Sequence, residues 1–358
     1  MTVRGEARVA VAARRGIPRP RVTAFAAGFA LLAVVVVLSA SIGAVGIPPR
    51  ETATVIAHHL HLPGASTPDF VADRIVWDVR LPRVLTAGIV GATLAASGVA
   101  YQGVFRNPLA DPFLIGVAAG AGLGGTIAIV SPLPLDFYGL GFVTLFAFLG
   151  AVVTAGLTYE LARSGRTVNP STHILAGVAM SSIAGAATSL LMMLNQDKIS
   201  VIFGWLYGDF TTSSWAKLEV LAPCAAVAGI VLVLLARQLD HLLLSEDEVR
   251  SLGLPVEHLK LAIILTASFA TAVCVSVSGT IGFVGLIVPH ACRLIAGAGH
   301  RTLLPFSMLA GASFLIAIDL ASRTVLPGQE VPAGILTAAL GGPFFLFLLR
   351  RQRRLVTG

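Results

Sequence analysis

Charged residues are scarce in this chain of 358 residues: Asp, Glu, Lys and Arg together make up only 12% of it, whereas hydrophobic residues make up 56%. Soluble domains carry about 25% charged residues, so a soluble fold of this composition would lack the polar surface that water requires. The low charge also argues against a disordered chain. With a mean hydropathy of +0.86, the composition predicts an all-α polytopic membrane protein.

Motifs that would indicate chemistry are also missing. The chain has only three lysines, and none lies in a glycine loop, so no phosphate-binding loop for ATP is present. Neither H-E-x-x-H nor G-x-S-x-G occurs. The three cysteines show no paired spacing, which argues against a disulfide framework or a zinc site. We therefore expect no enzymatic activity, no cofactor and no bound metal.

Apolar stretches long enough to cross a bilayer recur along the chain. A spanning helix needs about 20 mostly apolar residues, and the stretches that qualify predict ten spans: 22–45, 84–105, 113–131, 138–162, 172–194, 215–236, 260–279, 282–298, 303–322 and 333–350. The first is too long for the core of a secretory signal, so we interpret it as an uncleaved anchor. The predicted domains are a basic N-terminus, the ten-helix transmembrane domain and a tail: 1–21, 22–350 and 351–358.

Basic residues are divided unevenly between the two sides of these spans. Ten spans place both termini on one side, and 18 of the 25 lysines and arginines fall on that side. The positive-inside rule then predicts that both termini are cytoplasmic. The net charge of +7 mostly reflects this topology. Because no basic stripe alternates with exposed aromatic residues, nucleic-acid binding is not expected.

Glycine and proline positions predict local features of two spans. In the third span, Gly116, Gly120 and Gly124 recur at every fourth residue and predict close contact with a neighbouring helix. In the eighth span, Pro289 and the glycines around its start predict a short or broken helix. Broken helices often line a transport pathway.

Ionisable residues within the spans are few. Asp319 is the one acidic residue clearly inside a span, and Arg323 follows four residues later on the same helix face, where the two can pair. A proton- or ion-coupled transporter would place more such groups near the membrane centre. Three histidines of the first external loop could ligate a metal or a haem iron, although their spacing gives poor ligand geometry: His58, His59 and His61.

The segment between the sixth and seventh spans combines several helix signals. Ser245 and Glu248 form a capping box, and the acidic residues between them favour a helix N-terminus. Gly253 is a suitable C-terminal stop. The predicted two-turn helix carries Val249 and Leu252 on one face. From these residues alone, it is equally a lid on the bundle or a docking site for a partner protein.

Six short motifs carry a more specific signal. They are RLPRV at 80–84, GVFRNPLADP at 103–112, LAGVA at 175–179, WLYG at 205–208, GFVGLIVPH at 282–290 and EVPAG at 330–334. With these motifs in this order, and with ten spans, residues from about 22 to 350 resemble the permease subunits of the type II ABC importers for iron siderophores, haem and vitamin B12, a FecCD-like family.

The resemblance implies a complex of several subunits. Two permeases, identical or related, would surround a central path, with a cytoplasmic ABC ATPase dimer below and an extracytoplasmic solute-binding protein outside. ATP would drive alternating access, so that an iron chelate enters the cytoplasm across the cell membrane. A ferric siderophore is the first expected cargo, and haem or a corrinoid such as cobalamin is the alternative. Specificity would belong to the docked binding protein.

The resemblance also implies roles for individual residues. Three arginines would face the binding protein and pair with its glutamates: Arg80, Arg83 and Arg323. A segment at about 240–258 would couple to the ATPase through Ser245, Glu246, Asp247, Glu248, Val249, Arg250, Leu252, Gly253 and Leu254. A turn before the fifth span would form the cytoplasmic gate, although its proline departs from the polar residue usual there: Asn169, Pro170, Ser171 and Thr172.

Simpler interpretations stay open from the residues alone. An arginine at a span end can be an interfacial anchor, and Arg323 can pair within its own helix with Asp319. The turn at Asn169 can be a helix cap with proline at the first helical position. A secondary transporter that works without an ATPase is the alternative from another class, and uptake driven by a proton gradient alone would identify it.

The orientation can be tested with single cysteines. We expect a cysteine at Ser66 to react from outside the cell with a membrane-impermeant thiol reagent. A cysteine at Ser164 should not react, because the positive-inside rule places the loop that contains it in the cytoplasm. Labelling of intact and permeabilised cells measures the difference. Reversed labelling would contradict the predicted orientation.

Overall fold

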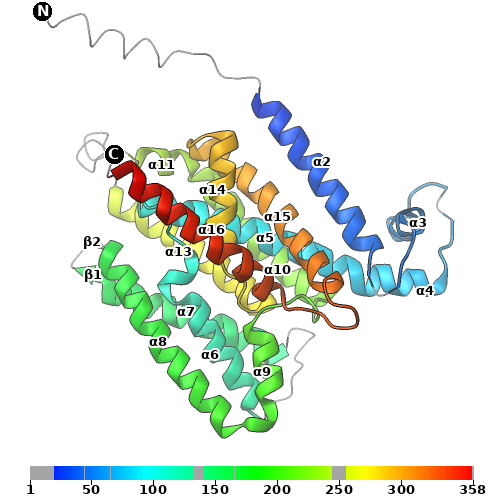
Figure 1. The fold of residues 1–358 in the computed structure, drawn as a ribbon, viewed down its shortest axis with the longest axis horizontal. Coiled ribbons are helices and arrows are strands. Elements are labelled where there is room, and N and C mark those ends of the chain that lie inside the picture. The colour runs from blue at the N-terminus through cyan, green and yellow to red at the C-terminus, as the bar shows by residue number, and fades with distance from the viewer. Residues whose placement is uncertain are drawn as a thin grey trace, which may run out of the picture.

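Helices make up almost all of the chain that the computed structural model describes, which is residues 20–43, 45–64, 66–132, 141–164, 167–168, 170–243 and 255–356 (Figure 1). Eight helices are long and apolar enough to cross a membrane. Two shorter apolar helices, Val117–Val130 and Val284–Ala296, lie where the third and eighth spans are predicted. The all-helical membrane fold expected from the sequence is confirmed.

The helices alternate with short connecting elements. The membrane helices are α2 (Pro20–Ser41), α5 (Leu81–Val104), α6 (Val117–Val130), α7 (Gly141–Ala162), α8 (Pro170–Leu194), α10 (Trp215–Leu234), α13 (Val256–Ser278), α14 (Val284–Ala296), α15 (His300–Thr324) and α16 (Ala333–Val356). The shorter elements are α3 (Pro49–His59), α4 (Phe70–Asp73), η2 (Arg74–Arg80), η3 (Pro112–Ile115), β1 (Arg163–Ser164), β2 (Thr167–Val168), η4 (Gln196–Lys198), α9 (Ile199–Leu206) and α11 (Ala236–His241). β1 and β2 pair antiparallel.

The alternating membrane helices give the bundle two ends. We call the end where α2 finishes the Ser41 end, and the end where α2 begins the Pro20 end. Contacts between residues at the helix ends and turns agree with this alternation. At the Ser41 end, Trp215 Nε1 donates to the Trp77 carbonyl oxygen at 3.0 Å. At the Pro20 end, Arg106 Nε donates to the Leu242 carbonyl oxygen at 2.7 Å.

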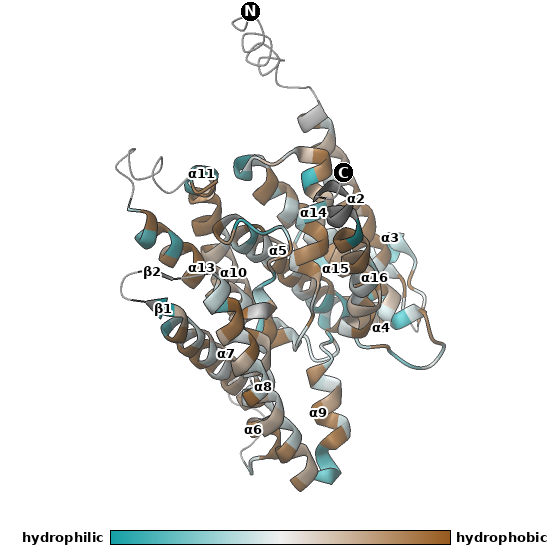
Figure 2. Ribbon diagram, turned by 60° about the vertical axis from the view of Figure 1, so that its left-hand side comes forward, coloured by the Kyte–Doolittle hydropathy of each residue, from teal (hydrophilic) through white to brown (hydrophobic). Residues whose placement is uncertain are grey.

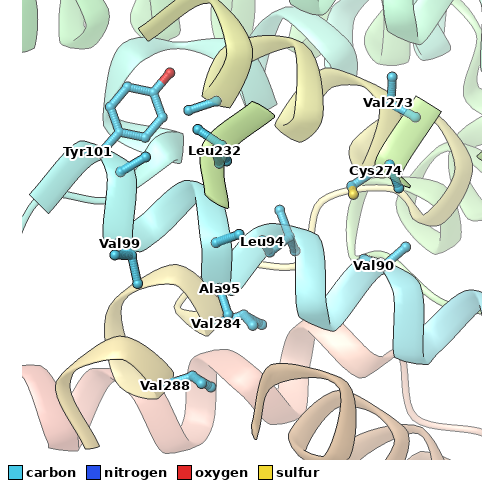
Figure 3. Close-up of a cluster of buried hydrophobic side chains, with 14 of the residues drawn as sticks. Val90, Leu94, Ala95, Val99, Tyr101, Leu232, Val273, Cys274, Val284 and Val288 are labelled. Atoms are coloured by element: carbon cyan, nitrogen blue, oxygen red, sulfur yellow. The ribbon is translucent and has the colours of Figure 1, made fainter. Parts of the chain in front are cut away.

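α5 lies at the centre of the bundle and contacts α15, α13, α14 and α10 (Figure 1). Figure 3 shows Leu94 and Val99 of α5 among Leu232, Val273 and Val284 from three of these helices. Most residues of α5 are buried. Many large apolar side chains are exposed, as expected where lipid replaces water, and apolar residues, drawn in brown, occur along most of the long helices (Figure 2).

Glycines let the central helices approach closely. A Cβ atom added to Gly98 of α5 would collide with the backbone of Gly285 in α14. The predicted close contact of the third span is confirmed for two of its three glycines, because a Cβ atom on Gly120 or Gly124 of α6 would collide with the backbone of α7. Gly116 instead precedes the helix with a left-handed φ of 83°. These contacts leave no room for a side chain and fix the helix positions.

α14 is short, as the sequence predicts. Phe283 before its first residue has a left-handed φ of 67°, and Pro289 lies inside the helix. The helix begins inside the bundle, where Gly285 contacts α5. A non-helical stretch at 279–283 therefore precedes it. From the Pro20 end, η3 reaches the same region, since its Pro112 ring lies beside Gly285.

The second membrane helix is longer than predicted. Its helical path begins at Phe70 rather than near residue 84, and runs through α4, the π-helix η2 and α5. Charged residues between 74 and 83 suggest a loop by hydropathy. They are instead satisfied by partners within the protein, so the helix continues through them.

Candidate functional site

Five charged side chains meet at the Ser41 end of the bundle. They come from η2, α5, α15 and the segment before α16, and we call them the charge cluster: Arg80, Arg83, Asp319, Arg323 and Glu330. Asp319 is fully buried, and Arg80 and Arg83 are 5% and 7% exposed. Buried charges are costly in a membrane unless they are paired, so their partners decide the local structure.

Arg83 joins α5 to two other segments. Its Nε donates to Asp319 Oδ1 of α15 at 2.9 Å. Its Nη1 and Nη2 donate to the two carboxylate oxygens of Glu330 at 3.2 and 2.9 Å. Such a bidentate pair fixes orientation as well as distance. Arg323 Nη2 lies 3.2 Å from Asp319 Oδ2, which confirms the pair that the sequence predicts within α15.

Two arginines of the charge cluster cap the end of α2. Arg80 Nη1 donates to the carbonyl oxygens of Ala40 and Ser41 at 2.9 and 2.8 Å. Arg323 Nη2 donates to the Ser39 carbonyl oxygen at 3.1 Å. The last carbonyl groups of a helix have no partner within it and carry its negative partial charge. Both arginines therefore satisfy α2 and anchor it to α5 and α15.

The π-helix η2 ends at Arg80, and α5 follows it directly. A π turn closes hydrogen bonds over five residues rather than four and is often found at functional sites. Arg80 contacts α2, whereas Arg83, three residues later, contacts α15.

The structure places these arginines deeper than the sequence suggests. The RLPRV motif predicts arginines just outside a span, whereas Arg80 and Arg83 are buried within a continuous helix. Glu330, which the sequence analysis did not select as a site residue, keeps 45% of its side chain exposed. A depression of about 720 Å³ lies over the charge cluster and is lined by residues including Arg80, Arg83, Arg323, Gln329 and Glu330.

A second feature is a cavity of about 690 Å³ that we call the α8 cavity. Small and apolar residues dominate it, and it contains no charged side chain. It is bordered by α6, α8, α9, α16 and the non-helical stretch before α14, through Phe113, Ala118, Ala119, Gly122, Gly185, Thr188, Ser189, Met192, Phe203, Leu206, Tyr207, Thr280, Gly282, Phe283, Gly334 and Ala338. Five of these residues belong to the motifs WLYG, GFVGLIVPH and EVPAG, namely Leu206, Tyr207, Gly282, Phe283 and Gly334. The sequence analysis assigned no site role to them or to the other lining residues.

The predicted gate lies at the other end of α8. Asn169 is outside the described residues, and Pro170 is the first residue of α8. Ser171 and Thr172 follow and are exposed. From Thr172 to Thr188 of the α8 cavity the helix rises about 24 Å, at 1.5 Å per residue. The predicted gate and the cavity are therefore separate places on one helix.

The predicted coupling residues, Ser245 to Leu254, lie outside the described residues. Both ends of that segment are placed. On one side, Asp240 Oδ1 accepts from the His300 backbone N–H and lies 2.8 Å from His300 Nδ1. On the other side, α13 begins at Val256. α11, which precedes the segment, is thus attached to the first residue of α15.

The histidines of the first loop have structural contacts. His59 Nε2 lies 2.8 Å from Asp73 Oδ1, and the ring stacks on Trp77 with a centroid distance of 3.9 Å. His58 contacts the edge of the His59 ring, and His61 lies beyond the helix. Among the described residues, no group of three or more His, Cys, Asp or Glu could hold a metal ion.

Asp111 of the GVFRNPLADP motif fixes the turn before α6. Its Oδ1 accepts from the Phe113 backbone N–H at 2.8 Å and so begins η3. Burial raises the pKa of this carboxyl to about 6, and the hydrogen bond from Phe113 opposes the rise. The contact holds Phe113 at the α8 cavity.

Both the sequence and the fold resemble known proteins. A model of the FecCD transport family matches residues 31–351. The cobalamin import system permease protein BtuC of Halobacterium salinarum is 42% identical over 279 residues, 78% of this chain and 74% of that protein. The hemin transport system permease protein HmuU of Yersinia pestis is 40% identical over 286 residues, which are 79% of this chain and 85% of that protein. A solved structure, described as an inward-facing conformation of a metal-chelate type ABC transporter, matches with TM-score 0.78 and 34% identity over 91% of this chain and 98% of the solved chain.

Removing the carboxylate at the centre of the charge cluster should destabilise the fold. We expect Asp319→Asn to lower stability by about 3–5 kcal/mol, because two buried guanidinium groups lose their shared partner. Thermal unfolding in detergent measures this loss. Asp78→Asn, which removes the partner of exposed Arg74, is the control and should leave the melting temperature unchanged. Equal melting temperatures for both variants would contradict the assignment.

Proposed function

This chain belongs to the FecCD transport family and is the permease subunit of an ABC importer, and on this premise we propose that its cargo is an iron chelate, with a ferric siderophore as the first candidate. It is a multi-pass membrane protein and not itself an enzyme. Haem and a corrinoid are the alternative cargoes, because relatives named for hemin and cobalamin transport share 40% and 42% identity with it.

The α8 cavity is the observation that supports this function. Its volume of about 690 Å³ and its uncharged lining suit a bulky solute that passes without being held tightly. A ligand that binds two conformations with equal affinity does not shift the equilibrium between them. A cargo held only weakly in this path would therefore not drive the conformational change, and the partner subunits would set the direction of transport. Specificity then belongs to a binding protein outside the membrane.

Partner subunits complete the proposed machine. An ABC ATPase dimer would dock on the segment around Ser245–Leu254 and act through α11, which contacts α15. A second copy of this chain, or a related permease, would close the α8 cavity, since α8 and α16 are mostly exposed in the single chain. The turn from Asn169 to Thr172 would be the cytoplasmic gate. Both termini, at the Pro20 end, would face the cytoplasm of a cell whose inner or plasma membrane holds the protein.

The binding protein would dock on the Ser41 end. The charge cluster contains three arginines and two carboxylates, so it carries one net positive charge. Arg80, Arg83 and Arg323 line the depression at this end, where an acidic side chain of the partner would be attracted. Because these arginines also hold α2 and α15, changes at the edge of the depression test docking more cleanly than changes to the arginines.

Uptake by the reconstituted complex tests the proposed cargo. With the ATPase and the binding protein in proteoliposomes, we expect ATP-dependent uptake of a ferric siderophore. Gly185→Phe should slow uptake while ATP hydrolysis persists, because a Cβ atom there meets open space in the α8 cavity. Ile230→Phe on the exposed face of α10 is the control. Uptake of hemin or cobalamin alone would contradict the cargo, and uptake driven by a proton gradient without the ATPase would contradict the class.

Docking is tested at Gln329, an exposed residue that lines the depression. We expect Gln329→Glu to weaken binding of the binding protein by up to about fivefold, which is the value of one exposed charge pair. Gln329→Lys should strengthen it, and added salt should reduce both effects. Surface plasmon resonance measures the affinities. Thr67→Glu, exposed in a separate loop, is the control, and an equal effect of this change would contradict docking at the charge cluster.

A further inference from the structure

A proline in the middle of α14 deprives one backbone carbonyl group of its usual helical donor. In a regular helix the Gly285 carbonyl oxygen would accept a hydrogen bond from the N–H of residue 289, but that residue is Pro289, which has no N–H. Both residues are buried. Because a buried carbonyl group without a partner is costly inside a membrane protein, a donor from elsewhere is needed at this place.

Gln102 of α5 supplies that donor. Its Nε2 donates to the Gly285 carbonyl oxygen at 3.1 Å, and the residue is 3% exposed. Gly98 lies one turn earlier on the same face of α5, and a Cβ atom added there would collide with the same carbonyl oxygen. The missing side chain at Gly98 thus lets α14 approach α5 closely enough for Gln102 to reach the carbonyl group. Figure 3 shows this approach at Ala95 of α5 and Val284 of α14.

Arg293 fixes the orientation of the Gln102 amide. Its Nη2 donates to Gln102 Oε1 at 2.9 Å, so the amide oxygen faces Arg293 and the amide nitrogen faces Gly285. Arg293 lies in the last turn of α14, beyond Pro289. Gln102 therefore bridges the two halves of α14 across the proline, which is where a helix that lacks a hydrogen bond bends.

The two ends of α14 lie at different regions of the proposed machine. Gly282 and Phe283, directly before the helix, line the α8 cavity. Beyond its last residue, residues 297–299 lead to His300, which is hydrogen-bonded to Asp240 of α11. α14 thus runs from the Pro20 end, where the ATPase is proposed to dock, to the wall of the proposed path.

We propose that Gln102 is a positioning residue for transport, because it makes α14 a rigid lever. A movement that α11 passes to His300 then displaces α14 as a whole, and Phe283 moves with it at the α8 cavity. Without the Gln102 bridge, the helix bends at Pro289 and absorbs the movement. This inference rests on the alternating access of the proposed function and names the residue that carries the movement between the two ends.

The accessibility of a cysteine in the α8 cavity tests the lever without any cargo. Gly185→Cys is introduced into the chain, which is reconstituted with its ATPase and binding protein. The rate of modification by a methanethiosulfonate reagent is then measured without nucleotide and with ATP and vanadate. We expect ATP to change this rate by at least about fivefold, the lower end of usual coupling between two sites. The chain with only its natural cysteines is the blank: Cys224, Cys274 and Cys292.

Variants of Gln102 then test the bridge. Gln102→Met removes the donor at similar side-chain volume, and we expect the modification rate to become independent of ATP while ATP hydrolysis persists. Gln102→Asn, whose shorter amide cannot reach both partners, should have the same effect. Adding Pro289→Ala to Gln102→Met should restore the response, because residue 289 then donates its own N–H to Gly285. Pro223→Ala, at a proline inside α10, is the matched control and should restore nothing.

The outcomes separate the lever from the proposed function. If Gln102 had only a structural role, its variants would lower the melting temperature but keep the ATP response of the folded protein, and this result would overturn the lever alone. Failure of Pro289→Ala to restore the response, or equal rescue by Pro223→Ala, would overturn the role of the Gly285 carbonyl group. The absence of any ATP response in Gly185→Cys alone would contradict the proposed path, and the lever with it.

Discussion

The buried ion pair between Arg83 and Asp319 is the constraint on which the Ser41 end of the bundle depends. Asp319 is fully buried, and its partner lies 236 residues earlier in the sequence. A single charge in this place would be strongly unfavourable, so α5 and α15 must remain in contact. Glu330 completes the pair from the segment before α16, and Arg80 and Arg323 extend the contact to α2. One polar cluster thus positions helices from both halves of the chain.

The same bundle combines closely packed and open regions. The closely packed region lies around α5, and the open region lies around α8, where the proposed path runs. Around α5, glycine contacts such as Gly98 with Gly285 bring backbones together. Around α8, small residues instead leave space, as at Gly185. In the alternating access proposed above, closely packed central helices would move as a unit while the space beside them changes.

The sequence predicts the number and order of the apolar helices but not their ends or their distant partners. Hydropathy misplaces the start of the second span because the charged residues from Arg74 to Arg83 have polar partners within the protein. The pair of Asp319 and Arg323 follows from helical periodicity alone, and the structure confirms it. The pair of Asp319 and Arg83 could not be predicted, because no local pattern reveals a contact between distant segments. The α8 cavity exists because small residues such as Gly185 leave space between helices. A small residue in an apolar span does not reveal from the sequence whether a neighbouring helix or an open space lies beside it.

A double-mutant cycle on Arg83 and Asp319 tests the central claim most directly. Arg83→Leu, Asp319→Leu and the combined variant are compared with the natural chain by unfolding in mixed micelles. The account predicts that each single change costs about 3–5 kcal/mol and that the combined change costs clearly less than their sum, because removing both partners leaves no isolated buried charge. Costs that add within about 0.5 kcal/mol would show that the two residues act independently, and would contradict the account.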